Sequence, residues 1–77
     1  MNEEKLKEII ADTFDIDEDE ITNEMTSDSV ERWDSLNHLR LVTALEDEFD
    51  IKLTMEEVNT MVDYPKIVEF VSRYTGG

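Results

Sequence analysis

Apolar residues recur every three or four positions in three stretches of the chain, and each stretch predicts a helix. In the first, the spacing i, i+3, i+4, i+7, i+8 is met by Leu6, Ile9, Ile10, Thr13 and Phe14. Asn2 suits an N-cap, and the acidic Glu3 and Glu4 suit the first turn, because the amino end of a helix carries partial positive charge. We therefore predict a helix from about Glu3 to Phe14.

The second periodic stretch is the strongest in the chain. Its apolar stripe, widened by Leu41, consists of Leu36, Leu39, Val42, Leu45 and Phe49. Asp34 stands where an N-cap belongs, and the interior is rich in good helix formers. The pattern predicts a helix from about Ser35 to Phe49.

A short helix should follow a connector at residues 51–53. Thr54 and Glu57 have the spacing of a capping box, in which each side chain accepts a hydrogen bond from the other residue's backbone N–H. The helix should run from about Met55 to Asn59 or Met61.

The last helix begins at the start signal Asp63-Tyr64-Pro65, where proline suits the first turn. Its apolar face is predicted to contain Ile67, Phe70, Val71 and Tyr74. The ending Thr75-Gly76-Gly77 predicts a helix stop followed by a loose end.

Residues 15–33 show no clean period and are rich in Asp, Glu, Ser, Thr and Asn. A polar connection of this length is unusual unless it is functional or fixed to a core. The residues expected to fix it are Ile16, Ile21, Met25 and Val30. The chain is thus predicted to be an all-α domain spanning residues 1–77, a small four-helix bundle of three longer helices and one short helix, with a long loop between helices 1 and 2.

The charge balance limits the classes of partner. With 7 Lys and Arg against 21 Asp and Glu, the net charge is −14. Such a surface repels nucleic acid and anionic membranes, whereas it attracts basic protein patches. The charge alternatively serves only to keep the domain soluble.

The chain has no cysteine, which excludes disulfides, thiolate metal sites and a cysteine nucleophile. No apolar stretch is long enough to span a bilayer, and the residues after Met1 do not resemble a signal peptide. We expect a cytoplasmic monomer that does not insert into membranes.

The acidic run at the start of the loop invites a test for a calcium site. Asp15, Asp17 and Asp19 match the first three oxygen ligands of an EF-hand loop. The match then fails, because the required glycine is Glu20 and the required bidentate glutamate is Thr26. We predict a solvated acidic loop that binds divalent ions loosely at most, and no metal site.

Asp34, Ser35 and His38 contain the residue types of a hydrolase triad. No residue of the pattern orients the imidazole, and a chain this small offers no obvious pocket for an acyl group. The favoured interpretation places His38 at the surface. Trp33 is expected to pack against the helix start, with contact to a partner protein as the alternative.

The triplet Asp-Ser-apolar occurs twice, around Ser29 and around Ser35. Ser35 lies in the first turn of the strongest helix, where a phosphate on its oxygen would meet free backbone N–H groups and the positive end of the helix dipole. The alternative is that Ser35 is an ordinary helix-start residue. No long period follows Ser29, which predicts a local turn or cap there.

At these residues the sequence resembles an acyl carrier protein. The resemblance rests on Trp33-Asp34-Ser35-Leu36, the apolar stripe after it and the acidic run that ends at Phe49, and it extends from the first helix to Val71. It implies that Ser35 carries 4′-phosphopantetheine on a phosphodiester. Asp34 would assist the attachment and support the helix start, and Leu36 would lie beside the arm. The arm would supply the thiol that the chain itself lacks.

The resemblance also implies partners, namely a phosphopantetheinyl transferase and acyl-loading and acyl-transfer enzymes with basic docking patches. The implied docking residues are Leu36, Arg40, Glu46, Asp47 and Glu48. Asn37, His38 and Arg40 replace acids found in many fatty-acid carriers, which suggests a specialised rather than a primary carrier in fatty acid, lipid or polyketide-type biosynthesis. The chain would have no catalysis of its own.

A second function class explains the acidity equally well. A small acidic interaction module, acting as a charge mimic or as an inhibitor of a basic partner, would need no prosthetic group and no special role for Ser35.

Overall fold

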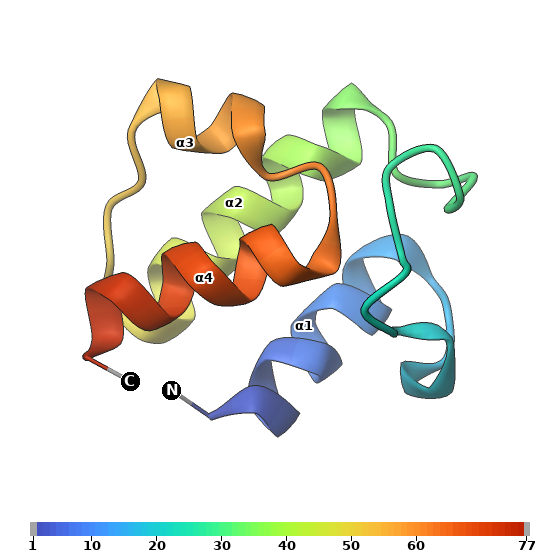
Figure 1. Ribbon diagram of the computed structural model, residues 1–77, viewed down its shortest axis with the longest axis horizontal. Helices are drawn as coiled ribbons and strands as arrows, with labels where there is room; N and C mark the ends of the chain where they lie inside the picture. The colour runs from blue at the N-terminus through green and yellow to red at the C-terminus, as the bar shows by residue number, and fades with distance from the viewer. Residues whose placement is uncertain (1, 77) are drawn as a thin grey trace.

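The computed structural model describes residues 2–76, which form four α-helices and one short 3-10 helix (Figure 1). In chain order they are α1 Glu3–Phe14, η1 Glu18–Glu20, α2 Ser35–Phe49, α3 Met55–Thr60 and α4 Tyr64–Thr75. The predicted all-α four-helix fold is confirmed, and η1 lies inside the loop between α1 and α2. Gly76 ends α4 in the left-handed conformation, whereas the loose end predicted at Gly77 lies outside the described residues.

Each α-helix begins at a polar side chain that accepts a hydrogen bond from a backbone N–H of the first turn. The four caps are Asn2, Asp34, Thr54 and Asp63. At α3 the predicted capping box is complete, because the Glu57 carboxylate also accepts a hydrogen bond from the Thr54 N–H at 2.9 Å. These local signals explain why the helix starts agree with the sequence.

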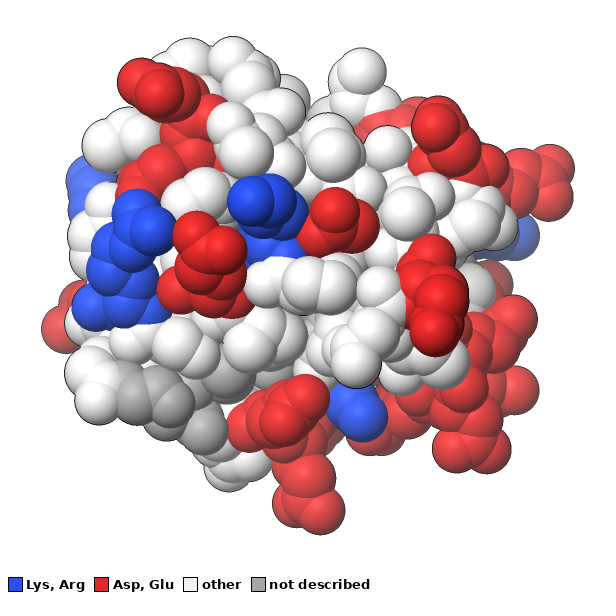
Figure 2. Space-filling view, in the orientation of Figure 1, with Lys and Arg blue, Asp and Glu red and all other residues white. Residues whose placement is uncertain are grey.

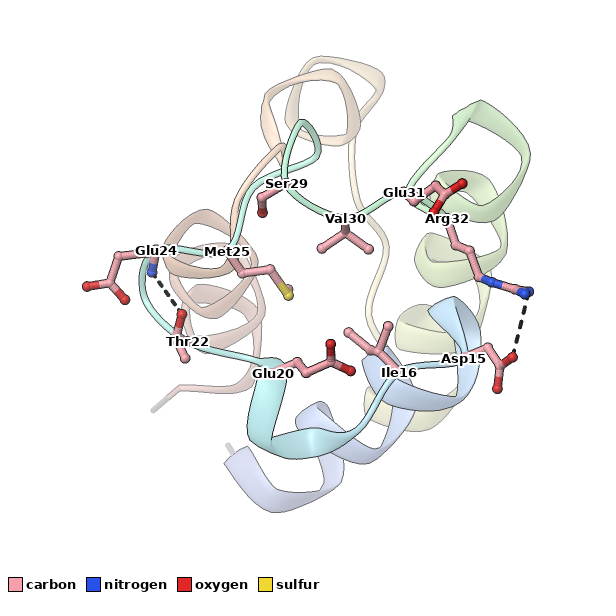
Figure 3. A pocket seen from close by; sticks show the side chains of 10 residues that line it. All are labelled: Asp15, Ile16, Glu20, Thr22, Glu24, Met25, Ser29, Val30, Glu31 and Arg32. Carbon is pink, nitrogen blue, oxygen red and sulfur yellow. Dashed lines mark hydrogen bonds and ion pairs between the residues drawn. The ribbon is translucent and has the colours of Figure 1, made fainter.

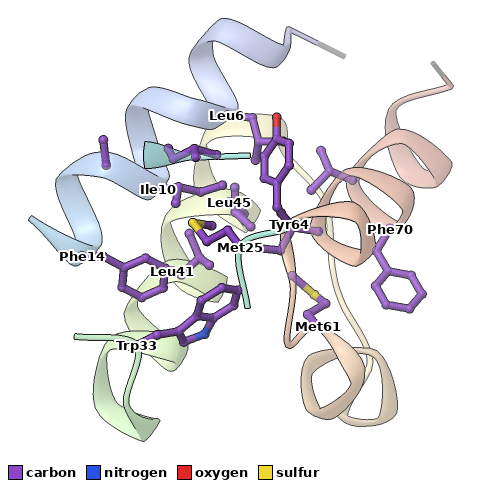
Figure 4. Packing of buried hydrophobic residues seen from close by; sticks show 14 residues of the cluster. Leu6, Ile10, Phe14, Met25, Trp33, Leu41, Leu45, Met61, Tyr64 and Phe70 are labelled. Atoms are coloured by element: carbon purple, nitrogen blue, oxygen red, sulfur yellow. The ribbon is translucent and has the colours of Figure 1, made fainter. Parts of the chain in front are cut away.

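One hydrophobic core joins α1, α2, α4, the loop and Met61, the residue directly after α3 (Figure 4). The largest fully buried side chains are Leu6, Ile10, Phe14, Leu41, Leu45, Met61, Ile67 and Val71. From the loop, Ile21 and Met25 are buried, and Ile16 and Val30 pack partly against the core, as predicted. The core residues therefore fix the long polar connection in place.

The loop is also joined to the α3–α4 connection by backbone hydrogen bonds. The Ser27 N–H donates to the Val62 carbonyl at 2.8 Å, and the Tyr64 N–H donates to the Met25 carbonyl at 3.1 Å. This pairing brings Ser27 and Val62 together next to the start of α2.

Two details of the predicted apolar faces are wrong. Leu36 and Leu39 are 60% and 56% exposed, and the buried face of α2 is made by Leu41, Val42 and Leu45. A helix turns roughly 100° per residue, so the steps of three from Leu36 to Leu45 pass about halfway round it and cannot all face the core. On α4, Tyr74 is 41% exposed and Tyr64 is buried instead.

No helix in residues 2–76 has the length and apolar character needed to cross a lipid bilayer.

Candidate functional site

The first turn of α2 is held in place by two side chains around Ser35. The Asp34 carboxylate accepts a hydrogen bond from the Asn37 N–H at 2.8 Å, and the Asn37 side-chain amide donates to the Arg32 carbonyl at 2.8 Å. Ser35 is exposed, and its hydroxyl makes no hydrogen bond to any described residue. Its oxygen is thus accessible to chemistry at the amino end of a 15-residue helix.

Trp33 and His38 are hydrogen-bonded to each other next to this turn, and together they link the loop, α2 and α3. The Trp33 indole N–H donates to His38 Nδ1 at 2.9 Å, and His38 Nε2 lies 2.7 Å from the Val58 carbonyl oxygen. Because Nδ1 accepts, the hydrogen of the neutral ring is assigned to Nε2, which donates to Val58. Trp33 is buried and stacks on Phe14 with ring centroids 4.9 Å apart, which confirms its packing role.

The expected surface position of His38 is therefore wrong, because its half-buried ring uses both nitrogens inside the fold. A base for Ser35 would need one of these nitrogens free. The Asp34 carboxylate accepts a hydrogen bond from the Asn37 N–H and, among residues 2–76, makes none to the His38 ring. The three residue types of a hydrolase are close in sequence without forming a catalytic triad.

A shallow pocket of about 230 Å³ adjoins Ser35. Besides Ser35, it is lined by Ser27, Trp33, Asp34, His38, Asn59 and Val62. The pocket combines side chains from the loop, from α2 and from the end of α3.

A larger hollow of about 530 Å³ lies between the loop and the end of α1, away from Ser35 (Figure 3). Its lining combines the apolar Ile16, Met25 and Val30 with acidic side chains. At its edge the Asp15 carboxylate lies 3.7 Å from the Arg32 guanidinium. No group of three possible metal ligands occurs in residues 2–76.

Ser29 also borders this hollow, and its hydroxyl is engaged in a turn. Its Oγ accepts a hydrogen bond from the Thr26 N–H at 2.9 Å and donates one to the Thr26 carbonyl at 3.0 Å. The predicted local turn chemistry of the first Asp-Ser triplet is confirmed.

The outward side of α2 carries a shallow, mainly apolar groove. It is lined by Leu36, Leu39, Arg40, Thr43, Ala44 and Asp47. Of the three acids expected to act in docking, only Asp47 lies there. The Glu46 carboxylate accepts a hydrogen bond from the Leu53 N–H at 2.8 Å, and the Glu48 carboxylate lies 3.6 Å from Lys5 Nζ on α1.

Two tyrosines and two glutamates connect distant parts of the bundle. The Tyr74 hydroxyl donates to Glu57 at 2.6 Å, and the Tyr64 hydroxyl donates to Glu3 at 2.7 Å. The pKa of Glu57 is lowered, first by the hydrogen bond from the Thr54 N–H and then by that from Tyr74. The pKa of Tyr64 is raised, first by burial and then by the Glu3 carboxylate.

Comparisons with known proteins agree on one family. The family model for the phosphopantetheine attachment site matches residues 4–73. Curated acyl carrier proteins from three strains of Clostridium perfringens (SM101, ATCC 13124 and 13) are each 38% identical over 72 residues, covering 94% of this chain and 95% of theirs. A solution structure of the holo acyl carrier protein from Geobacter metallireducens superposes with a TM-score of 0.85 at 26% identity, covering 95% of this chain and 84% of that one.

A small helical bundle that matches the attachment-site model is a phosphopantetheine-bearing carrier. Within that class, the chain belongs to the acyl carrier protein family. It holds acyl groups on a 4′-phosphopantetheine prosthetic group, is a carrier rather than an enzyme, and interacts with a phosphopantetheinyl transferase and with acyl-handling enzymes. Family membership therefore argues against the two alternative functions, a hydrolase and an acidic interaction module without a prosthetic group.

Proposed function

We propose that Ser35 is the residue that carries 4′-phosphopantetheine, and that residues 1–77 act as a single carrier domain. The observation that carries this proposal is the exposed hydroxyl of Ser35, free of hydrogen bonds to described residues, in the first turn of α2. A phosphodiester at this oxygen would lie near the first backbone N–H groups of the helix and its positive dipole end. The site therefore fits the charge of the group.

The neighbours of Ser35 suit supporting roles. Asp34 caps α2 and so fixes the turn that presents the serine, and it lines the same shallow pocket as Ser35. Leu36 is 60% exposed and offers an apolar contact directly beside the attachment point. Asp34 and Leu36 thus complete the proposed attachment site.

The two Asp-Ser triplets allow a matched test of the attachment site. The protein is incubated with coenzyme A, magnesium and a broad-specificity phosphopantetheinyl transferase, and its intact mass is measured. Wild type and Ser29→Ala should each gain one phosphopantetheine, and Ser35→Ala should gain none. A gain in Ser35→Ala, or none in folded wild type, would disprove attachment at Ser35.

The outward side of α2 is the proposed docking surface for partner enzymes. Leu36, Arg40 and Asp47 lie along its groove, and Asp47 suits a basic patch on the partner. Glu46 and Glu48 are bound to other parts of the chain, so they add negative potential from its flanks. The positive charge of Arg40 on this surface favours a specialised carrier over a primary one.

We further propose that the protein acts as a cytoplasmic monomer in fatty acid, lipid or polyketide-type biosynthesis. Its net charge of −14 supports the monomeric state and the lack of membrane insertion, because like-charged copies repel one another and anionic membranes repel the chain.

A further inference from the structure

One side chain holds α3 against α2 on the side of the bundle where Ser35 lies. His38 lies one helical turn after Ser35 on α2, and its Nε2 is 2.7 Å from the carbonyl oxygen of Val58 on α3. Within residues 2–76, no other hydrogen bond or ion pair joins these two helices. On its other side α3 is bound to α4, through the hydrogen bond from Tyr74 to Glu57. The boundary between α2 and α3 beside Ser35 is therefore held closed by His38.

The His38 ring cannot leave this boundary without losing two hydrogen bonds. Its Nδ1 accepts a hydrogen bond from the Trp33 indole at 2.9 Å, and Trp33 is itself buried and stacked on Phe14. Moving the ring would leave the buried indole N–H and the Val58 carbonyl without a partner, which is unfavourable. Both ring nitrogens thus hold His38 in place.

The hydrophobic core lies next to this boundary but is not open to it. Leu41 lies one turn after His38 on α2, and Met61 lies three residues after Val58; neither has any exposed surface. The shallow pocket beside Ser35 is lined by Trp33 and His38 and does not reach Leu41 or Met61. The two hydrogen-bonded side chains therefore separate the attachment site from the core.

An acyl chain on an arm at Ser35 would gain free energy by entering this core, because each buried CH₂ group is removed from water. The direct route parts α2 from α3 and breaks both hydrogen bonds of His38. We propose that His38 determines specificity by keeping acyl chains out of the core, so that this carrier takes short acyl groups and holds them in solvent for its partner enzymes. An acetyl or butyryl group has too few CH₂ groups to offset the lost hydrogen bonds. The proposal rests on attachment at Ser35.

Carriers loaded with acyl groups of different length test this exclusion. The chain is loaded from acetyl-, butyryl- or octanoyl-coenzyme A by a broad-specificity phosphopantetheinyl transferase, and the intact mass verifies each product. Thermal unfolding followed by circular dichroism should give wild type the same Tm with all three groups. In His38→Ala, octanoyl should raise the Tm above that of the acetyl form by about 4 °C or more, because even partial burial of the chain stabilises a domain of this size by that much.

Two control variants separate the exclusion from a loss of stability. His38→Gln keeps a donor and an acceptor on one side chain, so it should behave like wild type. Asn37→Ala removes the hydrogen bond to the Arg32 carbonyl without affecting α3, so it should lower the Tm of the acetyl and octanoyl forms equally.

Nuclear magnetic resonance locates the chain directly. In octanoyl-loaded His38→Ala, nuclear Overhauser contacts should join the methylene protons of the chain to Met61, and they should be absent in wild type. Where His38→Ala does not fold, His38→Leu takes its place, because it keeps most of the volume of the ring without its hydrogen bonds.

The outcomes distinguish this proposal from attachment itself. If folded wild type gains no mass, attachment at Ser35 and the exclusion both fail. If octanoyl raises the Tm of wild type, or contacts Met61 in it, attachment stands and the exclusion alone is overturned. If the Tm of the loaded His38→Ala or His38→Leu variant does not depend on chain length, His38 is not the residue that excludes the chain.

Discussion

His38 joins three parts of the chain through two hydrogen bonds. Its ring accepts from the buried indole of Trp33 and donates to the backbone of Val58, so all of these groups are satisfied. A buried donor or acceptor that loses its partner costs about 1–3 kcal/mol. The ring therefore stabilises the turn that presents Ser35 while taking no part in chemistry.

Replacing His38 tests this role. His38→Ala should lower the free energy of unfolding by about 1–3 kcal/mol, because the indole N–H and the Val58 carbonyl lose their partner. Trp33→Phe removes the indole N–H, so the double variant should cost less than the sum of the two single changes. Chemical denaturation of wild type, the two single variants and the double variant measures the coupling energy between Trp33 and His38. Strictly additive losses of stability would show that the two side chains do not interact.

At the scale of elements, α3 depends on its neighbours. It has only six residues, too few to be stable as an isolated helix. The Glu57 carboxylate closes its capping box, accepts a hydrogen bond from Tyr74 of α4 and lies 3.7 Å from the Arg73 guanidinium. One side chain thus connects the start of α3 to the end of α4.

This connection should depend on pH. The pKa of Glu57 in the folded protein lies below its ordinary value of 4.5, because the hydrogen bonds from the Thr54 N–H and Tyr74 favour the carboxylate. The stability it contributes is therefore fully present above the ordinary pKa and is lost as the pH falls through the folded pKa.

A comparison of Glu57→Gln with wild type isolates the effect, because the other acids titrate alike in both. The difference in Tm between the two proteins should be constant well above pH 4.5 and shrink below it. Thermal unfolding followed by circular dichroism across this range measures it. A difference that stays constant at acid pH would rule out the proposed role.

The sequence predicts the elements better than it predicts their contacts. Helix starts were correct because caps such as Asp34 and Thr54 act on the next three residues. The exposure of Leu36 was not predictable from spacing, since a stripe with steps of three does not show which side a second helix will cover. The contact between His38 and Val58 joins residues 20 apart, and neither residue carries a local signal for it.

The candidate site was predictable to a similar extent. The position of Ser35 at the start of α2 followed from local patterns, whereas the proposed role of the serine needed the family resemblance. Glu46 and Glu48 were grouped with Asp47 as neighbours in sequence, but they turn to the Leu53 backbone and to Lys5 because successive helix residues point in different directions.

At the scale of the whole molecule, charge is unevenly distributed. Figure 2 shows acidic side chains gathered on the side where η1 and the loop lie, with fewer basic side chains on the same view. Arg40 is exposed on the α2 groove, and it makes no ion pair within residues 2–76. This arginine interrupts the negative potential next to the proposed attachment point.

We therefore expect Arg40→Glu to raise, several-fold at low salt, the kcat/KM with which a phosphopantetheinyl transferase attaches phosphopantetheine to the chain. The transferase chosen for the test has a basic docking surface. Lys52→Glu, a substitution outside the groove, makes the same change in net charge, from −14 to −14 − 2 = −16, and should have a smaller effect. The difference in kcat/KM between the two variants should disappear at high salt, because the screening length falls from about 10 Å at 0.1 M to about 3 Å at 1 M. Equal effects of the two substitutions would show that only net charge matters.

The most direct test of the account asks whether Ser35 holds an acyl group through the arm. The chain is incubated with acetyl-coenzyme A, magnesium and a phosphopantetheinyl transferase, and its intact mass is measured before and after hydroxylamine, which cleaves thioesters. We predict a gain of one acetyl-phosphopantetheine in wild type, loss of the acetyl group alone on hydroxylamine treatment, and no gain in Ser35→Ala. An acetyl group that resists hydroxylamine, or a gain that persists in Ser35→Ala, would contradict the account.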